Sequence, residues 1–213
     1  MTPARLTLTS QRGPFLLKKA HALASIAEEN SGDVDATILL AAAGVEAFLN
    51  DLKRVEQVNN HPEPVLNALA TRMAHAEAHR LSPLKKLERA YAILQGAPST
   101  TTQPAFAAFN MLVALRNELI HYKPISGSDR SLLAAHPYAQ YFARLGLVPS
   151  AAHGYGGHLT WDRVVLVPAV ARWAYNTALR TVQLITTALP TSLASSELSR
   201  VWQSSLPALF AGV

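Results

Sequence analysis

The apolar pattern between residues 34 and 58 constrains the fold of this chain most strongly. Apolar residues recur there at alternating steps of four and three, the spacing that aligns side chains along one face of an α-helix. Asp33, directly before this segment, is an acceptable N-cap. A helix with so long an apolar face has to bury it, so we expect it to be the central helix of the protein. Its apolar positions are Val34, Ile38, Ala41, Val45, Phe48, Leu52 and Val55.

Helical periodicity and helix-ending residues account for most of the remaining chain. Proline fits the first turn of a helix, and glycine commonly follows its last turn. We therefore expect a first helix with the stripe Leu16, Ala20, Leu23 and Ala27; a third with Leu66, Leu69, Met73 and Ala76; a fourth from Ser82–Pro83 to Gly96; a fifth over 105–122; a shorter helical region that Pro137 splits and Gly146 ends; and a long helix from Pro168 to about Leu189.

Two segments outside these helices affect the fold class. Residues 161–167, WDRVVLV, have the composition of a short strand, but no second strand candidate exists to pair with them. We expect them to form a helical or extended lead-in to the helix that begins at Pro168. The tail from Thr191 is expected to add one more short helix. The predicted class is therefore all-α.

Length and composition predict one folded domain. The chain has 213 residues, of which 49% are hydrophobic and 15% charged, a balance that excludes a disordered protein. We expect a single domain over 1–213, with its core at about 14–189 and a C-terminal extension at 190–213. The absence of cysteine excludes thiolate metal sites and thiol catalysis, and it removes any need for an oxidising compartment.

The N-terminal segment, the length of the apolar runs and the net charge indicate where such a protein acts. The N-terminal segment lacks a basic start followed by an apolar run of signal-peptide length. The longest apolar run, residues 36–45, is too short to cross a membrane. We therefore expect a cytoplasmic protein with no membrane partner. The net charge of +5 is compatible with an anionic partner such as RNA or a nucleotide but does not establish one.

Polar residues with possible chemistry gather on the expected fifth helix. Asn110, Asn117 and His121 follow one another at steps of seven and four, so they lie along one helix face. Arg116 lies on the neighbouring apolar stripe, where a guanidinium needs a partner for its donors. Glu46 interrupts the apolar second helix, and Arg116 or His121 would serve as its cation. An ordinary salt bridge or an exposed helix face explains Glu46 equally well.

The segment RNELIHYKP, residues 116–124, resembles the HEPN superfamily. The signature of that superfamily is an arginine followed by a polar residue and, four to six residues after the arginine, a histidine. Arg116, Asn117 and His121 match this pattern. ILLAAAGVEAFLNDL upstream and VARWAYNTALRTVQLI downstream are similar to the helices that flank the motif in HEPN proteins. The resemblance covers roughly residues 30–190 and is sharp only at 116–121.

The resemblance implies a helical bundle of the HEPN type with additional peripheral helices, often dimeric, that acts as a metal-independent endoribonuclease. Such proteins work in toxin–antitoxin, phage-defence or RNA-processing settings, which makes an antitoxin or a defence-system protein a possible partner. Cleavage by the 2′-hydroxyl needs a proton acceptor, a proton donor and positive charge on the phosphorane. His121 could move the proton, Arg116 could stabilise the charge and Asn117 could orient a phosphate oxygen. No metal or other cofactor is expected.

One chain supplies only one such histidine, so we expect a homodimer in which two copies complete the site. The expected supporting residues are Glu46, Asn110, Tyr122 and Lys123. In HEPN toxins that a nucleotidyltransferase controls, the modified tyrosine lies two positions beyond the histidine. Here Tyr122 follows His121 directly and Lys123 holds that position, so we do not transfer this regulation.

Alternatives without catalysis remain open. Arg116, Asn117 and His121 could form only a helix-end salt bridge and cap, in a catalytically silent module that binds a nucleotide, RNA or a protein. His75 and His79 have the spacing of a metal-binding pair, yet the sequence offers no third ligand, and a solvated helix face is the better interpretation. His153 and His158 flank a glycine-rich segment without the context of a phosphate-binding loop.

Overall fold

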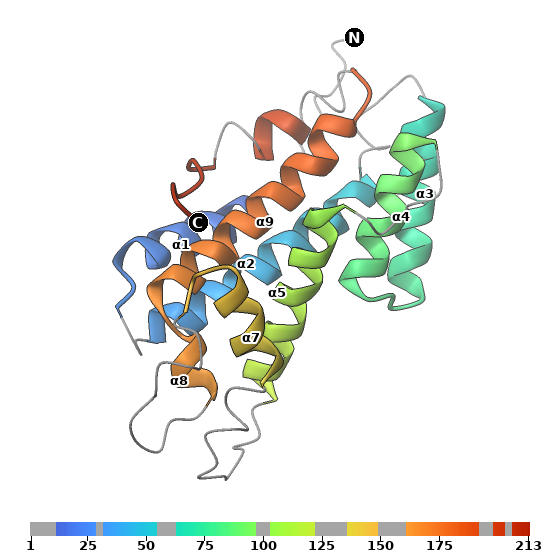
Figure 1. The fold of residues 1–213 in the computed structure, drawn as a ribbon. Coiled ribbons are helices and arrows are strands. Elements are labelled where there is room, and N and C mark those ends of the chain that lie inside the picture. Colours follow the sequence, from blue (N-terminus) through green and yellow to red (C-terminus); the bar gives the residue numbers. More distant parts are fainter. Residues whose placement is uncertain are drawn as a thin grey trace.

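The computed structural model describes residues 12–28, 32–54, 63–96, 103–121, 136–148, 161–191, 198–202 and 206–213. These residues form helices and no strand, so the predicted all-α class is confirmed (Figure 1). The helices are α1 (Arg12–Ile26), α2 (Gly32–Asp51), α3 (Pro64–Ala78), α4 (Pro83–Gln95), α5 (Pro104–Ile120), α7 (Pro137–Arg144), α8 (Trp161–Val165) and α9 (Pro168–Ala188), followed by a short helix at 198–202.

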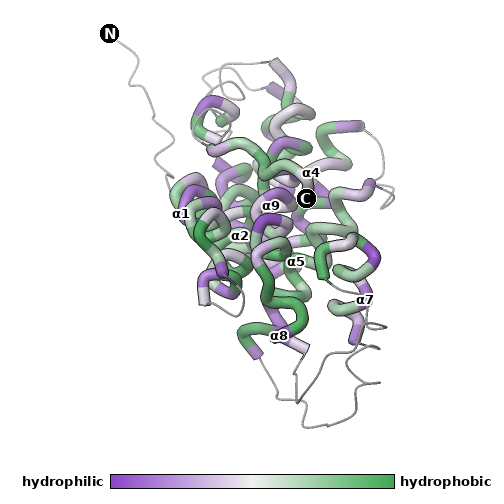
Figure 2. Tube along the Cα trace, turned by 60° about the vertical axis from the view of Figure 1, so that its left-hand side comes forward, coloured by the Kyte–Doolittle hydropathy of each residue, from purple (hydrophilic) through white to green (hydrophobic). Residues whose placement is uncertain are grey.

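Helices α2 and α9 share the centre of the bundle. α2 packs against α1, α3, α4, α5 and α9, and its predicted apolar face is buried from Val34 to Leu52, while Val55 lies outside the described residues. α9 packs against α1, α2, α4 and α5 and is buried around most of its circumference. Figure 2 shows α9 between α1 and α2 on one side and α5 on the other. The prediction of a single central helix was therefore incomplete.

Capping residues place several helix ends where the sequence predicts them. The Ser82 hydroxyl accepts a hydrogen bond from the backbone N–H of Lys85 at 3.4 Å, and Pro83 occupies the first turn of α4. Gly96 ends this helix with φ of 64°, a conformation in which glycine is least strained. Pro137 begins α7, and the part of this region expected before it lies outside the described residues, as does residue 122 at the end of the fifth helix.

The first helix shows one error in the predicted burial. Ala20 and Ala27 are buried as expected, but Leu16 and Leu23 are only half-buried. Leu17 and Ala24 occupy the core instead, because α1 turns a neighbouring face toward α2 and α9. Among the described residues, no helix is both long and apolar enough to cross a membrane.

The C-terminal tail, residues 206–213, lies against α9 and is held to it by hydrogen bonds. The Asn176 side chain donates to the Phe210 carbonyl at 3.0 Å and accepts from the Phe210 N–H at 2.9 Å. The Tyr175 hydroxyl donates to the carbonyl of Pro207 at 2.6 Å. The Phe210 ring stacks on His21 of α1, with 4.5 Å between ring centroids. This part of the expected C-terminal extension therefore belongs to the packed bundle.

Asn176→Ala should destabilise the protein by about 1–3 kcal/mol, because Asn176 is buried and its loss leaves two backbone groups of Phe210 unpaired. Urea unfolding of the variant measures this change in the free energy of unfolding. Gln183→Ala is the matched control, since Gln183 lies on the same helix and is exposed. Equal stabilities for the two variants would contradict the bonding role assigned to Asn176.

Candidate functional site

Arg116 forms an ion pair with Glu46 that links α5 to α2. A guanidinium nitrogen of Arg116 donates to the Glu46 carboxylate, and the two side chains are 23% and 31% exposed. The residues are 70 positions apart in the chain, so packing of the two helices makes the pair. The sequence left Arg116 and His121 as possible partners of Glu46, and the structure pairs it with Arg116. This partly buried pair fixes the orientation of the guanidinium.

Asn110, Asn117 and His121 share one side of α5, as their spacing predicts, and the structure shows that all three are exposed. His121 is the C-cap residue, and its backbone N–H donates to the carbonyl of Asn117 at 3.0 Å. Arg116 and His121 are five positions apart, which separates them by about 140° around a helix axis. One chain therefore directs Arg116 toward α2 and leaves His121 toward solvent. Tyr122 and Lys123 lie outside the described residues.

A cavity of about 350 Å³ opens beside the Arg116–Glu46 pair. It lies where α2 and α5 meet the turn between α3 and α4. Three cationic and two carboxylate side chains line it, so the net charge of these five side chains is +1. The sequence points to two of its lining residues, Glu46 and Arg116, but not to the cavity itself. The polar and charged lining residues are Glu46, Asn50, Glu77, Arg80, Ser82, Lys86 and Arg116.

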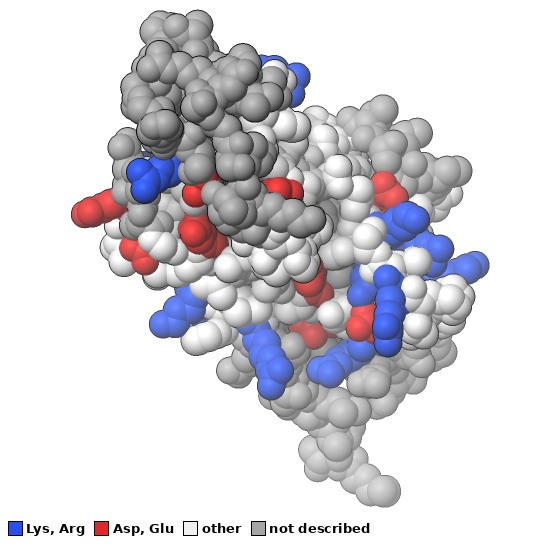
Figure 3. Space-filling view, turned by 90° about the horizontal axis from the view of Figure 1, so that it is seen from below, with Lys and Arg blue, Asp and Glu red and all other residues white. Residues whose placement is uncertain are grey.

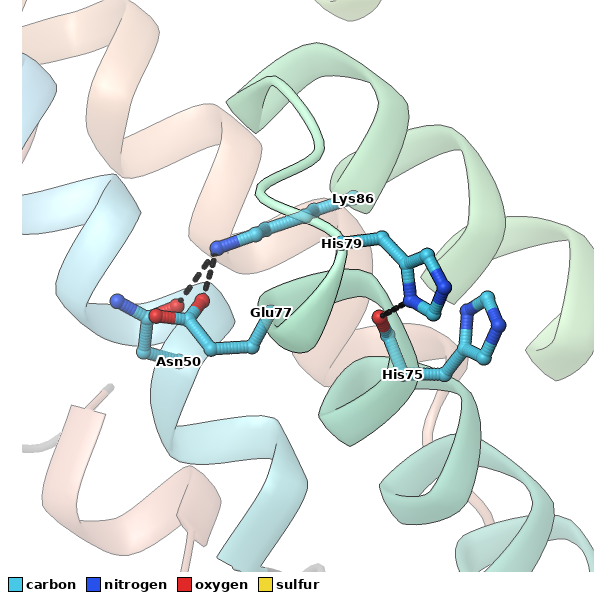
Figure 4. Close-up of polar contacts among 5 residues, drawn as sticks. All are labelled: Asn50, His75, Glu77, His79 and Lys86. Atoms are coloured by element: carbon cyan, nitrogen blue, oxygen red, sulfur yellow. Dashed lines mark hydrogen bonds and ion pairs between the residues drawn. The ribbon is translucent and has the colours of Figure 1, made fainter.

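A second ion pair, between Lys86 and Glu77, also lines the cavity. Figure 4 shows this pair. The Lys86 amino group donates to Glu77 and also to the side-chain oxygen of Asn50, the latter at 3.1 Å. The hydrogen bond from Lys86 lowers the pKa of Glu77. Lys86 thus joins α3 and α4 to α2, and its side chain is only 12% exposed.

His75 and His79 stack on each other on the outer side of α3, with 3.9 Å between ring centroids (Figure 4). The His79 Nδ1 is hydrogen-bonded to the His75 carbonyl at 2.9 Å. The charge of His79 is the main cause that lowers the pKa of exposed His75. The rings lie parallel instead of converging on one point, and the described part of the chain holds no group of three potential metal ligands. The preferred solvated-face interpretation fits this geometry.

His136 is a further histidine in a packed environment, and the sequence pattern does not single it out. Its ring stacks on Trp161 at 4.8 Å with an interplanar angle of 2°, which places the start of α7 against α8. Burial lowers the pKa of His136, and the Glu118 carboxylate on α5 acts in the opposite direction. Its Nδ1 atom is buried without a hydrogen-bond partner among the described residues. No local pattern around residue 136 indicates this packing.

The lowered histidine pKa values predict acid sensitivity. Burial lowers the pKa of both His21 and His136 below the value of about 6.5 expected in an unfolded chain. Below about pH 6.5 the unfolded state therefore binds more protons than the folded state, and the free energy of unfolding should fall as the pH falls. Their contribution is fully present above this pH. Urea unfolding at about pH 7.5 and about pH 5.5 measures the difference.

His136→Phe is the variant that isolates part of this effect. Phenylalanine keeps an aromatic ring on Trp161 but cannot titrate, so the loss of stability between the two pH values should be smaller than in the wild type. An unchanged loss would show that His136 does not contribute to the acid sensitivity.

Comparison of the chain with protein-family models, curated proteins and solved structures finds no match. The resemblance to HEPN proteins therefore depends on Arg116, Asn117, His121 and the helices around them.

Proposed function

We propose that this protein is a metal-independent endoribonuclease of the HEPN type. The observation that supports the proposal most is that Glu46 holds the Arg116 guanidinium at the edge of a cavity whose charged side chains sum to +1. The next residue on the same helix is Asn117, and the helix ends at exposed His121. These side chains can supply the proton transfer, the positive charge and the phosphate orientation that cleavage by a 2′-hydroxyl uses.

In the proposed reaction, the 2′-oxygen of RNA forms a bond to phosphorus and the bond to the leaving 5′-oxygen breaks. A neutral His121 accepts the proton of the 2′-hydroxyl, and a second, protonated histidine donates a proton to the leaving oxygen. Arg116 stabilises the negative charge on the phosphorane. Glu46 holds one nitrogen of the guanidinium, which leaves other N–H donors for phosphate oxygens. Asn117 orients one of these oxygens.

The separation of Arg116 from His121 favours a site made by two chains. Two copies that face each other across a two-fold axis would supply two histidines and two arginines. The exposed side of α5 offers a surface for this contact, and Ile120, next to His121, is an apolar side chain that is 53% exposed. We therefore propose a homodimer. The proposed setting is a toxin–antitoxin or phage-defence system in the cytoplasm, with an antitoxin or a defence protein as the partner.

Cleavage of RNA in the presence of EDTA tests the proposal. The wild-type protein should cut RNA into products that end in a 2′,3′-cyclic phosphate, because the 2′-hydroxyl is the nucleophile. RNA with 2′-O-methyl groups is the matched control and should stay intact. Cleavage that disappears in EDTA and returns with Mg²⁺ would contradict the proposal, as would cleavage of the methylated RNA.

A second candidate is a catalytically silent helical module that binds RNA, a nucleotide or a protein. The ion pair favours this module, since Glu46 already neutralises the charge of Arg116. The directions of the two side chains favour it as well, because within one chain Arg116 points toward α2 and His121 points toward solvent. Stoichiometric binding of RNA without any product would distinguish this module from an enzyme.

A further inference from the structure

Arg80 occupies a backbone position that normally selects glycine. It follows His79, the C-cap residue of α3, and it has φ of 50°. The N–H of Leu81 donates to the Ala76 carbonyl and the N–H of Arg80 donates to the Glu77 carbonyl, both at 2.9 Å. These two bonds define a Schellman motif, in which the left-handed residue is usually glycine. Among the described residues, Arg80 is the only one other than glycine with positive φ.

The protein therefore has an arginine at a position where the backbone conformation favours glycine. A β-carbon in the left-handed region approaches the following carbonyl oxygen, and glycine avoids this cost. Such strain often accompanies a functional role. In this protein, the strained turn places Arg80 on the wall of the cavity that Arg116 and Lys86 also line.

The ion pairs in the cavity leave Arg80 as its uncompensated charge. Glu46 neutralises Arg116, and Glu77 neutralises Lys86. Arg80 is exposed, and its guanidinium has no ion pair with any residue that the structure describes. Lys and Arg side chains also gather over the side of the molecule where Figure 1 shows α3 and α4 (Figure 3). This surface attracts anions, and the cavity offers the anion a free guanidinium.

We propose that Arg80 and the cavity beside it bind a backbone phosphate of single-stranded RNA. This inference rests on the proposed ribonuclease function, because the bound phosphate would belong to a strand whose scissile bond lies near Arg116. A guanidinium can bind two phosphate oxygens at once. The Ser82 hydroxyl is exposed and accepts a bond from Lys85, so its own proton can donate to the same phosphate. Arg80 thus positions the strand, and Arg116 acts at the reacting phosphate.

Binding of a fluorescein-labelled 2′-O-methyl RNA, measured by fluorescence anisotropy, tests this assignment without cleavage. Arg80→Ala should raise the Kd about tenfold, since it removes charge-assisted hydrogen bonds. It should also reduce the slope of log K against log salt by about 0.7, the contribution of one phosphate contact on a single strand. Arg72→Ala is the matched control, because Arg72 is exposed on α3 but does not line the cavity. It should change the Kd by no more than about twofold.

Arg80→Gly separates binding from folding. It should weaken RNA binding as Arg80→Ala does, while it raises the Tm by about 2–4 °C through relief of the left-handed strain. Equal Kd values and salt slopes for wild type, Arg80→Ala and Arg72→Ala would overturn the inference, even if the wild type cleaves RNA. If the wild type binds the methylated RNA through Arg80 but cleaves no RNA, the phosphate site stands and the proposed catalytic function fails.

Discussion

His121→Ala should reduce RNA cleavage by about 10²–10⁴-fold, the range that general acid–base catalysis by one side chain contributes. The same substitution should change the free energy of unfolding by no more than about 0.5 kcal/mol, because His121 is exposed and its cap hydrogen bond to Asn117 uses backbone atoms. The combination is diagnostic. Removal of a structural histidine would lower the free energy of unfolding, whereas removal of a catalytic histidine would not.

His79→Ala is the matched control for this prediction. His79 is also an exposed histidine at a helix C-cap, and it ends α3 as His121 ends α5. Its ring stacks on His75 (Figure 4). RNA cleavage by His79→Ala should match the wild type, with both rates measured in EDTA at equal protein concentration. Full cleavage by His121→Ala in a nuclease-free preparation would remove His121 from the mechanism.

Trp202→Ala should destabilise the protein by about 3–5 kcal/mol, the cost of removing a large aromatic side chain from a core. Trp202 is 0% exposed and packs edge-on against Phe48 of α2, with 4.9 Å between ring centroids. It also fits against Gly13 of α1, where an added β-carbon would lie 1.9 Å from the indole ring. The short helix at 198–202 is thereby packed against α1 and α2.

Urea unfolding of Trp202→Ala measures this effect, with Leu209→Ala as the control because Leu209 is an apolar side chain that is 39% exposed. Gly13→Ala should also be destabilising, since its new methyl group cannot enter the space that the indole fills. A Trp202→Ala protein as stable as the Leu209→Ala protein would show that the short helix contributes little to the core.

The sequence determined the helices because their signals are local. The apolar face of α2, the Ser82 cap and first-turn proline of α4, its final Gly96 and the start of α9 at Pro168 depend on residues within a few turns of each other. The same local periodicity placed Asn110, Asn117 and His121 on one side of α5. The same pattern indicated that the Arg116 guanidinium needs a partner for its donors, since Arg116 interrupts an apolar stripe.

Only the tertiary structure decided which side chains meet. Arg116 reaches Glu46 across 70 residues, and Lys86 reaches Asn50 across 36, because the packing of α2 against α4 and α5 fixes those distances. The cavity around Arg80 exists only where three separate parts of the chain converge. Periodicity fixes the direction of a side chain around its own helix, but not the rotation and depth at which that helix packs. For that reason the sequence selected Arg116 and His121 and could not select Arg80.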